Sequence, residues 1–162
     1  MTTTLIVSDS GPLISFSRAN KLWIIYEVYK AVIIPTEVYN EIVVKGRGKP
    51  GAEEIKRSRW ITVREPKNQD EVTRLKIKFD PGESESIALA QELTATLLAD
   101  ERIAIKEARS RGLKITSTHL TLEEAKNRGF IASVKKELEE LIAAGFRTTK
   151  ELITESLQRM GE

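Results

Sequence analysis

The chain has 162 residues, of which 40% are hydrophobic and 31% charged, as in a folded domain with a real core and not in a disordered protein. Cysteine is absent, which excludes disulfides, thiolate metal sites and cysteine nucleophiles and favours a reducing cytoplasm. No segment approaches the roughly 20 apolar residues of a membrane span, and no basic region precedes the short N-terminal apolar run, so we expect neither membrane insertion nor secretion.

The predicted elements alternate between short apolar runs and helical patterns, which is typical of a parallel sheet covered by helices. The expected strands are 5–8, 31–34, 60–63, 95–99 and 114–117. The expected helices are 12–19, 22–29, 36–44, 52–58, 70–78, 83–93, 102–111, 120–128, 133–144 and 148–160. Thr36 is expected to cap its helix, and the alternating segment 60–63 suits an edge strand. We see no linker or repeat, so a single domain over residues 1–162 is expected.

Positive charge is concentrated in the middle of the chain, although the overall charge is only +2. Residues 45–78 hold eleven Lys and Arg against five Asp and Glu, a net +6, so the remainder carries −4. Such a segment is either an ordinary solvated surface or a docking surface for a polyanion. Within it, Lys45, Arg47 and Lys49 lie in a glycine-rich stretch that resembles a phosphate-backbone contact more than a nucleotide cradle.

Two acids follow apolar runs at the points where strands are expected to end. Asp9 follows Leu5-Ile6-Val7-Ser8, and Asp100 follows the run 95–99 and precedes Glu101. Each alone could be a helix N-cap, a purely structural role. The carboxyl ends of parallel strands meet at one edge of a sheet, where ligands bind in α/β folds, so the pair favours a functional site.

Two helices offer further acids. Helical spacing places Glu83 in line with Ile87 and Ala90 on the stripe expected to face the core, whereas Glu85 is expected nearer the edge of that face. Glu83 is therefore preferred, with Glu85 kept as a secondary candidate. In the helix after Pro35, Glu41 is preferred over Glu37, because a first-turn acid has a capping explanation.

Four carboxylates at one edge would repel one another unless a cation lay between them. Oxygen-only ligands suit Mg²⁺ or Mn²⁺, which can activate a water, orient a phosphate and neutralise developing charge. The pattern thus predicts metal-assisted phosphodiester hydrolysis. Other chemistries fit poorly: His119 is the single histidine, which excludes a His-based zinc cluster, and neither a GxSxG elbow nor a Walker A loop is present. His119 itself is expected to be structural.

The same stretches carry a family resemblance. The chain resembles PIN domains, and among them the VapC-like toxins and their archaeal relatives with a GE-type third motif. The matching stretches are VSDSGPLI at 7–14, VIIPTEVYNEI at 32–42, DPGESESIALA at 80–90, LLADERIAIKEARSRGLKITST at 97–118, and KNRGFI and AAGFR in the tail. In similar proteins Glu83 is often Asp, and a glycine-containing TGT stands where this chain has the start of TSTHL.

The resemblance implies a three-layer α/β/α fold with a central parallel sheet, C-terminal helices 120–160 packed on it, and Mg²⁺- or Mn²⁺-dependent ribonuclease activity. It implies metal ligation by Asp9, Glu41, Glu83 and Asp100, and it suggests a homodimer and neutralisation by a small antitoxin. Secondary site candidates are Ser10, Glu37, Glu85, Glu101 and Ser117.

Two alternatives from other classes stay open. The chain could be a catalytically silent module that uses this fold to hold RNA or a protein partner. It could also be a phospho-accepting, receiver-like domain, since that fold clusters acids at strand ends; against it, Lys114 begins its strand where that chemistry needs a lysine at a strand end.

Overall fold

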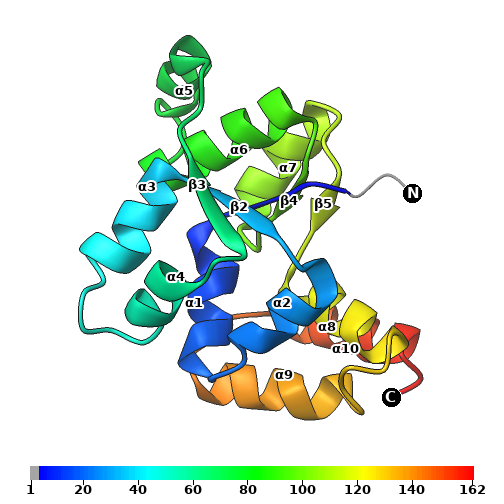
Figure 1. Ribbon diagram of the computed structural model, residues 1–162. Helices are drawn as coiled ribbons and strands as arrows, with labels where there is room; N and C mark the ends of the chain where they lie inside the picture. The colour runs from blue at the N-terminus through cyan, green and yellow to red at the C-terminus, as the bar shows by residue number, and fades with distance from the viewer. Residues whose placement is uncertain (1–3) are drawn as a thin grey trace.

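Five short parallel strands form one sheet in the computed structural model, which describes residues 4–162 (Figure 1). The strands are β1 (Ile6–Ser8), β2 (Val32–Pro35), β3 (Ile61–Arg64), β4 (Thr96–Leu98) and β5 (Ile115–Thr116). Their spatial order is β3-β2-β1-β4-β5. The predicted parallel sheet and the predicted edge position of the segment 60–63 are therefore confirmed. Residues 1–3 of the domain predicted over 1–162 lie outside the described residues.

The order of the strands creates a switch point between β1 and β4. From β1 the chain proceeds to β2 and β3 on one side, and it returns to β4 and β5 on the other. Ser8 pairs with Leu98 in the register of these two central strands, and the Asp9 N–H donates to the Leu98 carbonyl oxygen at 3.0 Å. In open α/β sheets the crevice beyond such a switch point is where ligands bind.

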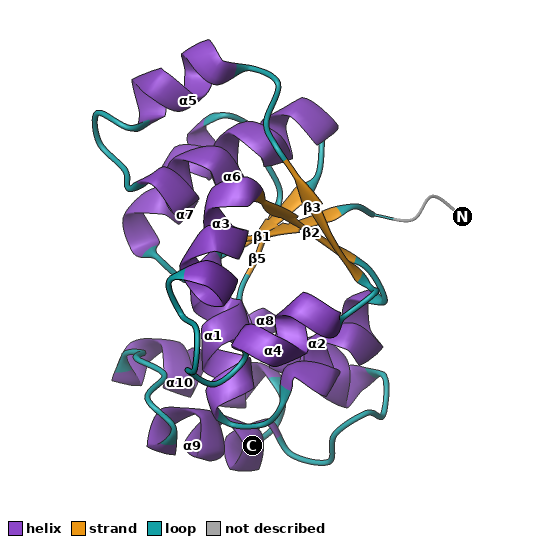
Figure 2. Ribbon diagram, turned by 60° about the vertical axis from the view of Figure 1, so that its left-hand side comes forward, coloured by secondary structure: helices purple, strands orange, loops and turns teal. Residues whose placement is uncertain are grey.

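Helices cover both faces of the sheet. They are α1 (Ser10–Arg18), α2 (Leu22–Tyr29), α3 (Thr36–Tyr39), the π-helix η1 (Asn40–Val44), α4 (Ala52–Arg57), α5 (Gln69–Leu75), α6 (Pro81–Leu93), α7 (Arg102–Ser110), α8 (Thr118–Asn127), α9 (Val134–Ala143) and α10 (Lys150–Arg159). Figure 2 shows α6 and α7 on one side of the strands and α1, α2 and α8 on the other. This is the predicted three-layer α/β/α arrangement.

Alternate residues of the central strands enter two separate cores. Ile6 and Leu98 pack in the cluster formed with α1, α2, α8 and α9, whereas Val7 and Leu97 pack in the cluster formed with α6 and α7. Side chains of a strand alternate between its faces, so a sheet covered on both sides buries every residue of its central strands. This explains why the sequence shows a continuous apolar run there.

The helix predicted over 36–44 differs from the observed one. Pro35, not Thr36, is the N-cap residue of α3, and after Tyr39 the backbone widens into the π-helix η1. Thr36 lies one position inside the helix, where its hydroxyl is not the capping group. Hydrophobic spacing does not distinguish α from π hydrogen bonding over five residues, and single π turns are frequent near functional sites.

The C-terminal helices pack beneath the sheet, as expected for 120–160. Leu122 of α8 and Leu138 and Leu141 of α9 belong to the core that includes α1 and α2. Helix α8 begins at Thr118, two residues before the predicted start, because the Ser117 side chain accepts the Leu120 N–H and caps the helix. Across residues 4–162, every helix is too short or too polar to cross a lipid bilayer.

Candidate functional site

Asp9 lies directly beyond β1 at the switch point and is almost fully buried, with 7% of its surface exposed. Its carboxylate accepts the Ser10 N–H at 2.9 Å and so caps α1, and the Ser86 hydroxyl oxygen lies 3.4 Å away. The capping explanation for Asp9 is thus correct as far as it goes. A cap needs only one oxygen at the helix end, however, and does not require burial of the charge.

The surroundings of Asp9 disfavour its negative charge. Burial is the main cause that raises the Asp9 pKa, to about 7, against the lowering effect of the Ser10 hydrogen bond; the charges of Glu83, Asp80 and Glu41 raise it further. Two of the acids predicted to join Asp9 therefore lie near enough to repel it. Asp80, which the sequence reasoning did not single out, is the third.

Glu41 reaches this cluster from η1. Its carboxylate lies over the first turn of α6: a Cβ added to Gly82 would be 3.3 Å from Glu41 Oε2 and 3.6 Å from Asp80 Oδ1. Gly82 therefore gives two carboxylates room to approach the start of α6. Glu41 is solvent-exposed, so its side chain can reorient at little cost.

Glu85 is more buried than Glu83, which is the reverse of the prediction. Glu85 is the buried residue, at 6% exposure, and accepts the Glu37 N–H at 2.9 Å. Glu83 is half-buried and forms a capping box with Asp80, whose carboxylate accepts the Glu83 N–H at 2.7 Å. Helix α6 is buried on nearly all sides from Ser84 to Ala90, so no single stripe marks its core face, and the prediction from helical periodicity is wrong for this reason.

Burial raises the pKa of both glutamates. For Glu83 the charges of Asp80 and Glu101 act in the same direction, while the hydrogen bond from the Asp80 backbone opposes them. For Glu85 the hydrogen bond from the Glu37 backbone and the Lys76 charge lower the pKa against burial. Glu85 thereby joins α6 to α3, the helix that leads into Glu41.

Asp100 lies beyond β4 but does not cap the next helix. The N-cap residue of α7 is Glu101, whereas the Asp100 carboxylate accepts the Thr118 N–H at 2.9 Å and the Thr118 hydroxyl at 2.6 Å. Burial raises the Asp100 pKa, the two Thr118 bonds lower it and the Glu101 charge raises it. The Glu101 charge raises the pKa of both Asp100 and Glu83. We call the carboxyl ends of β1 and β4, with the acids Asp9, Glu41, Asp80, Glu83 and Asp100, the acidic edge.

The remaining secondary candidates have structural partners. Ser10 is buried and its N–H is bound by Asp9, Glu37 supplies the N–H that Glu85 accepts, and Ser117 caps α8. Thr118, which holds Asp100 in place, was missed by the sequence reasoning. Thr118 is the first residue of α8, two positions after the strand β5, and nothing in the local sequence marks its side chain as a partner of Asp100.

The donor set fits a hard divalent cation better than any other ligand. The acids that surround Asp9 carry only carboxylate oxygens, and the nearby charges that act on its pKa are all negative. Within residues 4–162, no three carboxylate or imidazole side chains lie close enough together to hold one ion as they stand. A bound ion would therefore require side chains such as Glu41 and Glu83 to turn inward.

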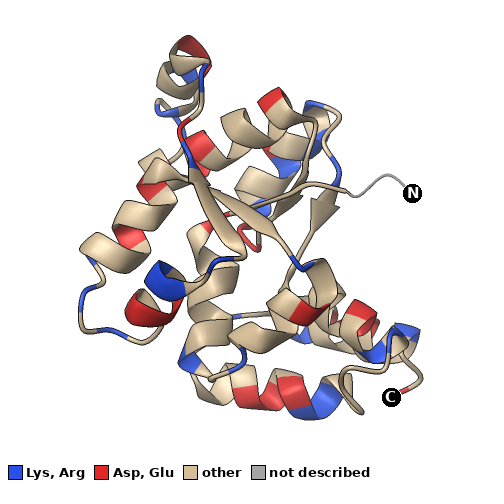
Figure 3. Ribbon diagram, viewed as in Figure 1, with Lys and Arg blue, Asp and Glu red and all other residues tan. Residues whose placement is uncertain are grey.

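The basic loop 45–51 extends from η1 beside this edge. Lys45, Arg47 and Lys49 are all exposed, and Figure 3 shows the blue positions of this loop at the left of the molecule. Gly51 anchors its end: the backbone has φ +93°, and a Cβ there would lie 2.6 Å from the Ser17 side chain on α1. The loop is therefore docked against the helix that Asp9 caps.

His119 is buried and structural, as expected. Its Nε2 lies 2.7 Å from the Thr148 hydroxyl oxygen, its ring packs 5.8 Å from that of Phe146, and burial lowers its pKa. The neutral ring thus ties α8 to the segment before α10.

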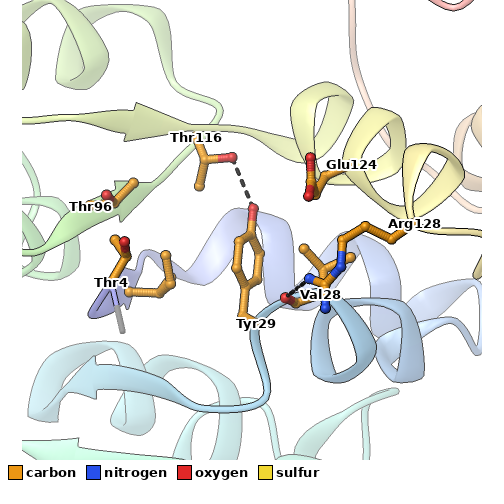
Figure 4. Close-up of a pocket in the computed structure, with 8 residues that line it drawn as sticks. Thr4, Val28, Tyr29, Thr96, Thr116, Glu124 and Arg128 are labelled. Atoms are coloured by element: carbon orange, nitrogen blue, oxygen red, sulfur yellow. Dashed lines mark hydrogen bonds between the residues drawn. The ribbon is translucent and has the colours of Figure 1, made fainter. Parts of the chain in front are cut away.

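A pocket of about 350 Å³ opens at the amino ends of β1 and β4, opposite to Asp9 and Asp100 (Figure 4). The Tyr29 hydroxyl oxygen lies at its centre, 2.9 Å from that of Thr116. The residues that line the pocket are Thr4, Ile6, Val28, Tyr29, Thr96, Thr116, Glu124 and Arg128. The four acids Asp9, Glu41, Glu83 and Asp100 are not among them.

A family model described as PIN domain matches residues 5–162. The chain belongs to the PIN-domain family. PIN domains are generally metal-dependent nucleases that act on RNA, so the family and the chemistry of the acidic edge agree at this coarse level. No protein with a curated description matches the chain.

Among solved structures, this PIN domain is similar to a PilT N-terminus domain protein from the hyperthermophilic archaeon Sulfolobus solfataricus P2. The two share 18% sequence identity with a TM-score of 0.48, over 90% of this chain and 97% of the other.

Proposed function

We propose that this PIN domain is a metal-dependent endoribonuclease whose site is formed by Asp9, Glu41, Glu83 and Asp100. The observation that carries the proposal is the buried Asp9 carboxylate at the switch point, with Glu83, Asp80 and Glu41 close enough to raise its pKa. Such an arrangement is costly without a counter-charge, and strained electrostatics of this kind mark functional sites.

The four residues would hold Mg²⁺ or Mn²⁺, which supplies an activated water and neutralises charge on the scissile phosphate. The protein's own contribution is positioning. Thr118 fixes the Asp100 carboxylate through two hydrogen bonds, and Glu85 fixes the start of α3, the helix that leads into Glu41. Lys45, Arg47 and Lys49 would contact the phosphate backbone of the RNA.

The experiment mixes the purified chain with single-stranded and structured RNA, with and without Mg²⁺ or Mn²⁺. We expect cleavage that depends on the ion and that falls by about 1,000-fold or more in the double variant Asp9→Asn/Asp100→Asn, because metal-assisted stabilisation of the transition state is worth several kcal/mol. The matched control is Glu123→Gln, which alters a buried acid whose partners are Ser156 and Arg159 of α10. Absence of cleavage, or cleavage that survives in the double variant, would refute the assignment.

A catalytically silent RNA-binding module on the same fold is the second candidate. One observation favours it: residues 4–162 contain no group of three ligands already placed for an ion, and Glu83 is engaged in a capping box. Titration calorimetry with Mn²⁺ separates the two functions. Saturable binding that is lost in Asp9→Asn supports the nuclease, whereas salt-sensitive RNA binding without saturable metal binding supports the silent module.

The proposal extends to a toxin role with two protein partners, a small antitoxin and a second copy of the chain. Its support is the motif resemblance described above. Induced expression in a bacterial host should arrest growth, and Asp9→Asn should relieve the arrest. Light scattering of the purified chain gives the number of copies.

A further inference from the structure

The acidic edge poses an electrostatic problem for the substrate assigned to it. Asp9, Glu41, Asp80 and Glu83 lie together, and RNA is a polyanion. Repulsion between the cluster and the phosphates must be offset by cations on the path of the strand, beyond any ion at the site itself. The exposed cations next to the cluster should therefore reveal that path.

One such group is the loop 45–49, which leaves η1 directly after the segment that carries Glu41. A second group lies on the other side of the cluster, in the turn between α5 and α6. There Lys76, Ile77 and Lys78 precede the capping box of Asp80 and Glu83, and all three are exposed. The Lys76 charge is close enough to lower the pKa of Glu85.

The two loops thus flank the acids from separate elements. The Glu41 carboxylate lies over Gly82, so the start of η1 and the start of α6 meet at the cluster. The loop 45–49 continues from the first of these elements, and 76–78 leads into the second. α5, which precedes the second loop, projects beyond the sheet at the top of Figure 1.

Ile77 gives this second loop a chemistry that charge alone does not. It is 87% exposed, the highest value among the exposed large hydrophobic residues, and it stands between two lysines. Ile77 belongs to neither hydrophobic core, so core packing does not explain an apolar residue at this position. An apolar side chain between two cations can contact the face of an unpaired base while the lysines bind the adjacent phosphates, and a paired base would not offer that face.

We propose that the loop Lys76–Ile77–Lys78 is a binding site for single-stranded RNA, which crosses the acidic edge between this loop and the loop 45–49. The proposal rests on the proposed ribonuclease function. It places phosphates of the strand on Lys76 and Lys78 and a base against Ile77.

The test measures binding of a fluorescently labelled 12-nucleotide single-stranded RNA to the full chain carrying Asp9→Asn, so that cleavage does not interfere. Removing both charges with Lys76→Gln/Lys78→Gln should weaken binding about 20-fold at 0.1 M salt. It should also reduce the slope of log affinity against log salt by about 1.4, because each phosphate contact on a single strand contributes about 0.7. Ile77→Ser should weaken binding about threefold without changing the slope, because a single base contact is modest and uncharged.

Matched controls make the same changes elsewhere. Lys135→Gln/Lys136→Gln removes two exposed charges from α9, and Leu152→Ser replaces an exposed apolar residue of α10. Melting temperatures recorded for every variant check that each is folded. The proposal is overturned if the loop variants match these controls, or if a 12-base-pair RNA duplex binds as tightly as the single strand.

Cleavage kinetics of the chain with Asp9 intact test the loop proposal separately from the proposed ribonuclease function. Lys76→Gln/Lys78→Gln should raise KM about 20-fold with kcat within about twofold, since these contacts hold substrate and transition state equally. If RNA is cleaved and neither KM nor affinity changes, the loop proposal fails and the nuclease stands. If RNA binds through the loop but is never cleaved, the nuclease fails and the binding site stands.

Discussion

The carboxyl edge of the sheet and the C-terminal helices both bury acids, but the pKa of the buried acid is raised in the first region and lowered in the second. Beyond β1, burial and three acidic neighbours raise the Asp9 pKa to about 7. On α8, Glu123 is as buried, at 5% exposure, and burial alone would raise its pKa; hydrogen bonds from Arg159 and Ser156 outweigh that effect and lower it. Paired burial stabilises a fold, whereas unpaired burial of like charges weakens it and needs another explanation.

The same contrast applies to the last residue of the chain. Burial acts to raise the Glu162 pKa, but hydrogen bonds from Lys126, Ser133 and the Val134 and Lys135 N–H groups lower it to about 2. The Glu162 carboxylate thus caps α9 and pairs with Lys126. The acids of the C-terminal helices serve stability, and those of the strand ends are available for a cation.

The largest effect that tests this contrast is the dependence of stability on pH without divalent ions. The Asp9 pKa is 3.8 when unfolded and about 7 when folded, so the folded state binds the extra proton between these values. The stabilisation is complete below about pH 4 and is lost as pH rises through 7, a change of up to about 4 kcal/mol. Urea unfolding in a chelator at pH 5 and pH 8 measures the part lost above pH 5, about 2.7 kcal/mol for the two units between pH 5 and the folded-state pKa of about 7.

The control is Asp9→Asn, which cannot titrate and should show a flatter dependence over the same range. Mg²⁺ or Mn²⁺ should restore stability at pH 8 in the parent chain and not in the variant, because an ion that binds only the folded state stabilises it. An equally steep pH dependence in Asp9→Asn would assign the effect to other acids.

A smaller effect is expected from breaking the Glu123 pair. Arg159 donates to the Glu123 carboxylate at 2.7 and 2.8 Å, so Arg159→Ala leaves a buried charge with Ser156 alone. We expect a loss of about 2 kcal/mol, below that of a fully buried pair because the Arg159 side chain is 47% exposed. Urea unfolding at pH 7 measures it. RNA cleavage should be unchanged; a parallel loss of activity would join the two regions.

The smallest effect concerns Glu162. Glu162→Gln should cost about 1 kcal/mol, since it weakens a helix cap and removes an ion pair while keeping one acceptor oxygen. Lys126→Gln removes the ion pair but spares the cap, and should cost about half as much. Thermal unfolding compares them, and an equal loss in both variants would mean that the cap contributes nothing.

The sequence alone predicted much of this molecule. Short apolar runs located all five strands, and breakers located the helices to within a few residues, because burial on both faces and helix capping are local properties of the chain. It also placed Asp9 and Asp100 after two parallel strands, since a strand that ends at a polar residue is visible in any single segment. The family resemblance followed from the same stretches.

Only the tertiary structure decided how the acids are used. Periodicity favoured Glu83 for the core, yet Glu85 is buried, because α6 is covered by the sheet and by neighbouring helices on nearly all sides. Asp80 near Asp9, Thr118 on Asp100 and the Glu41 carboxylate over Gly82 join segments far apart in the chain, and no local pattern encodes such contacts. A carboxylate's neighbours, and hence its pKa, are set by packing at long range, whereas its position at a strand end is set by the strand itself.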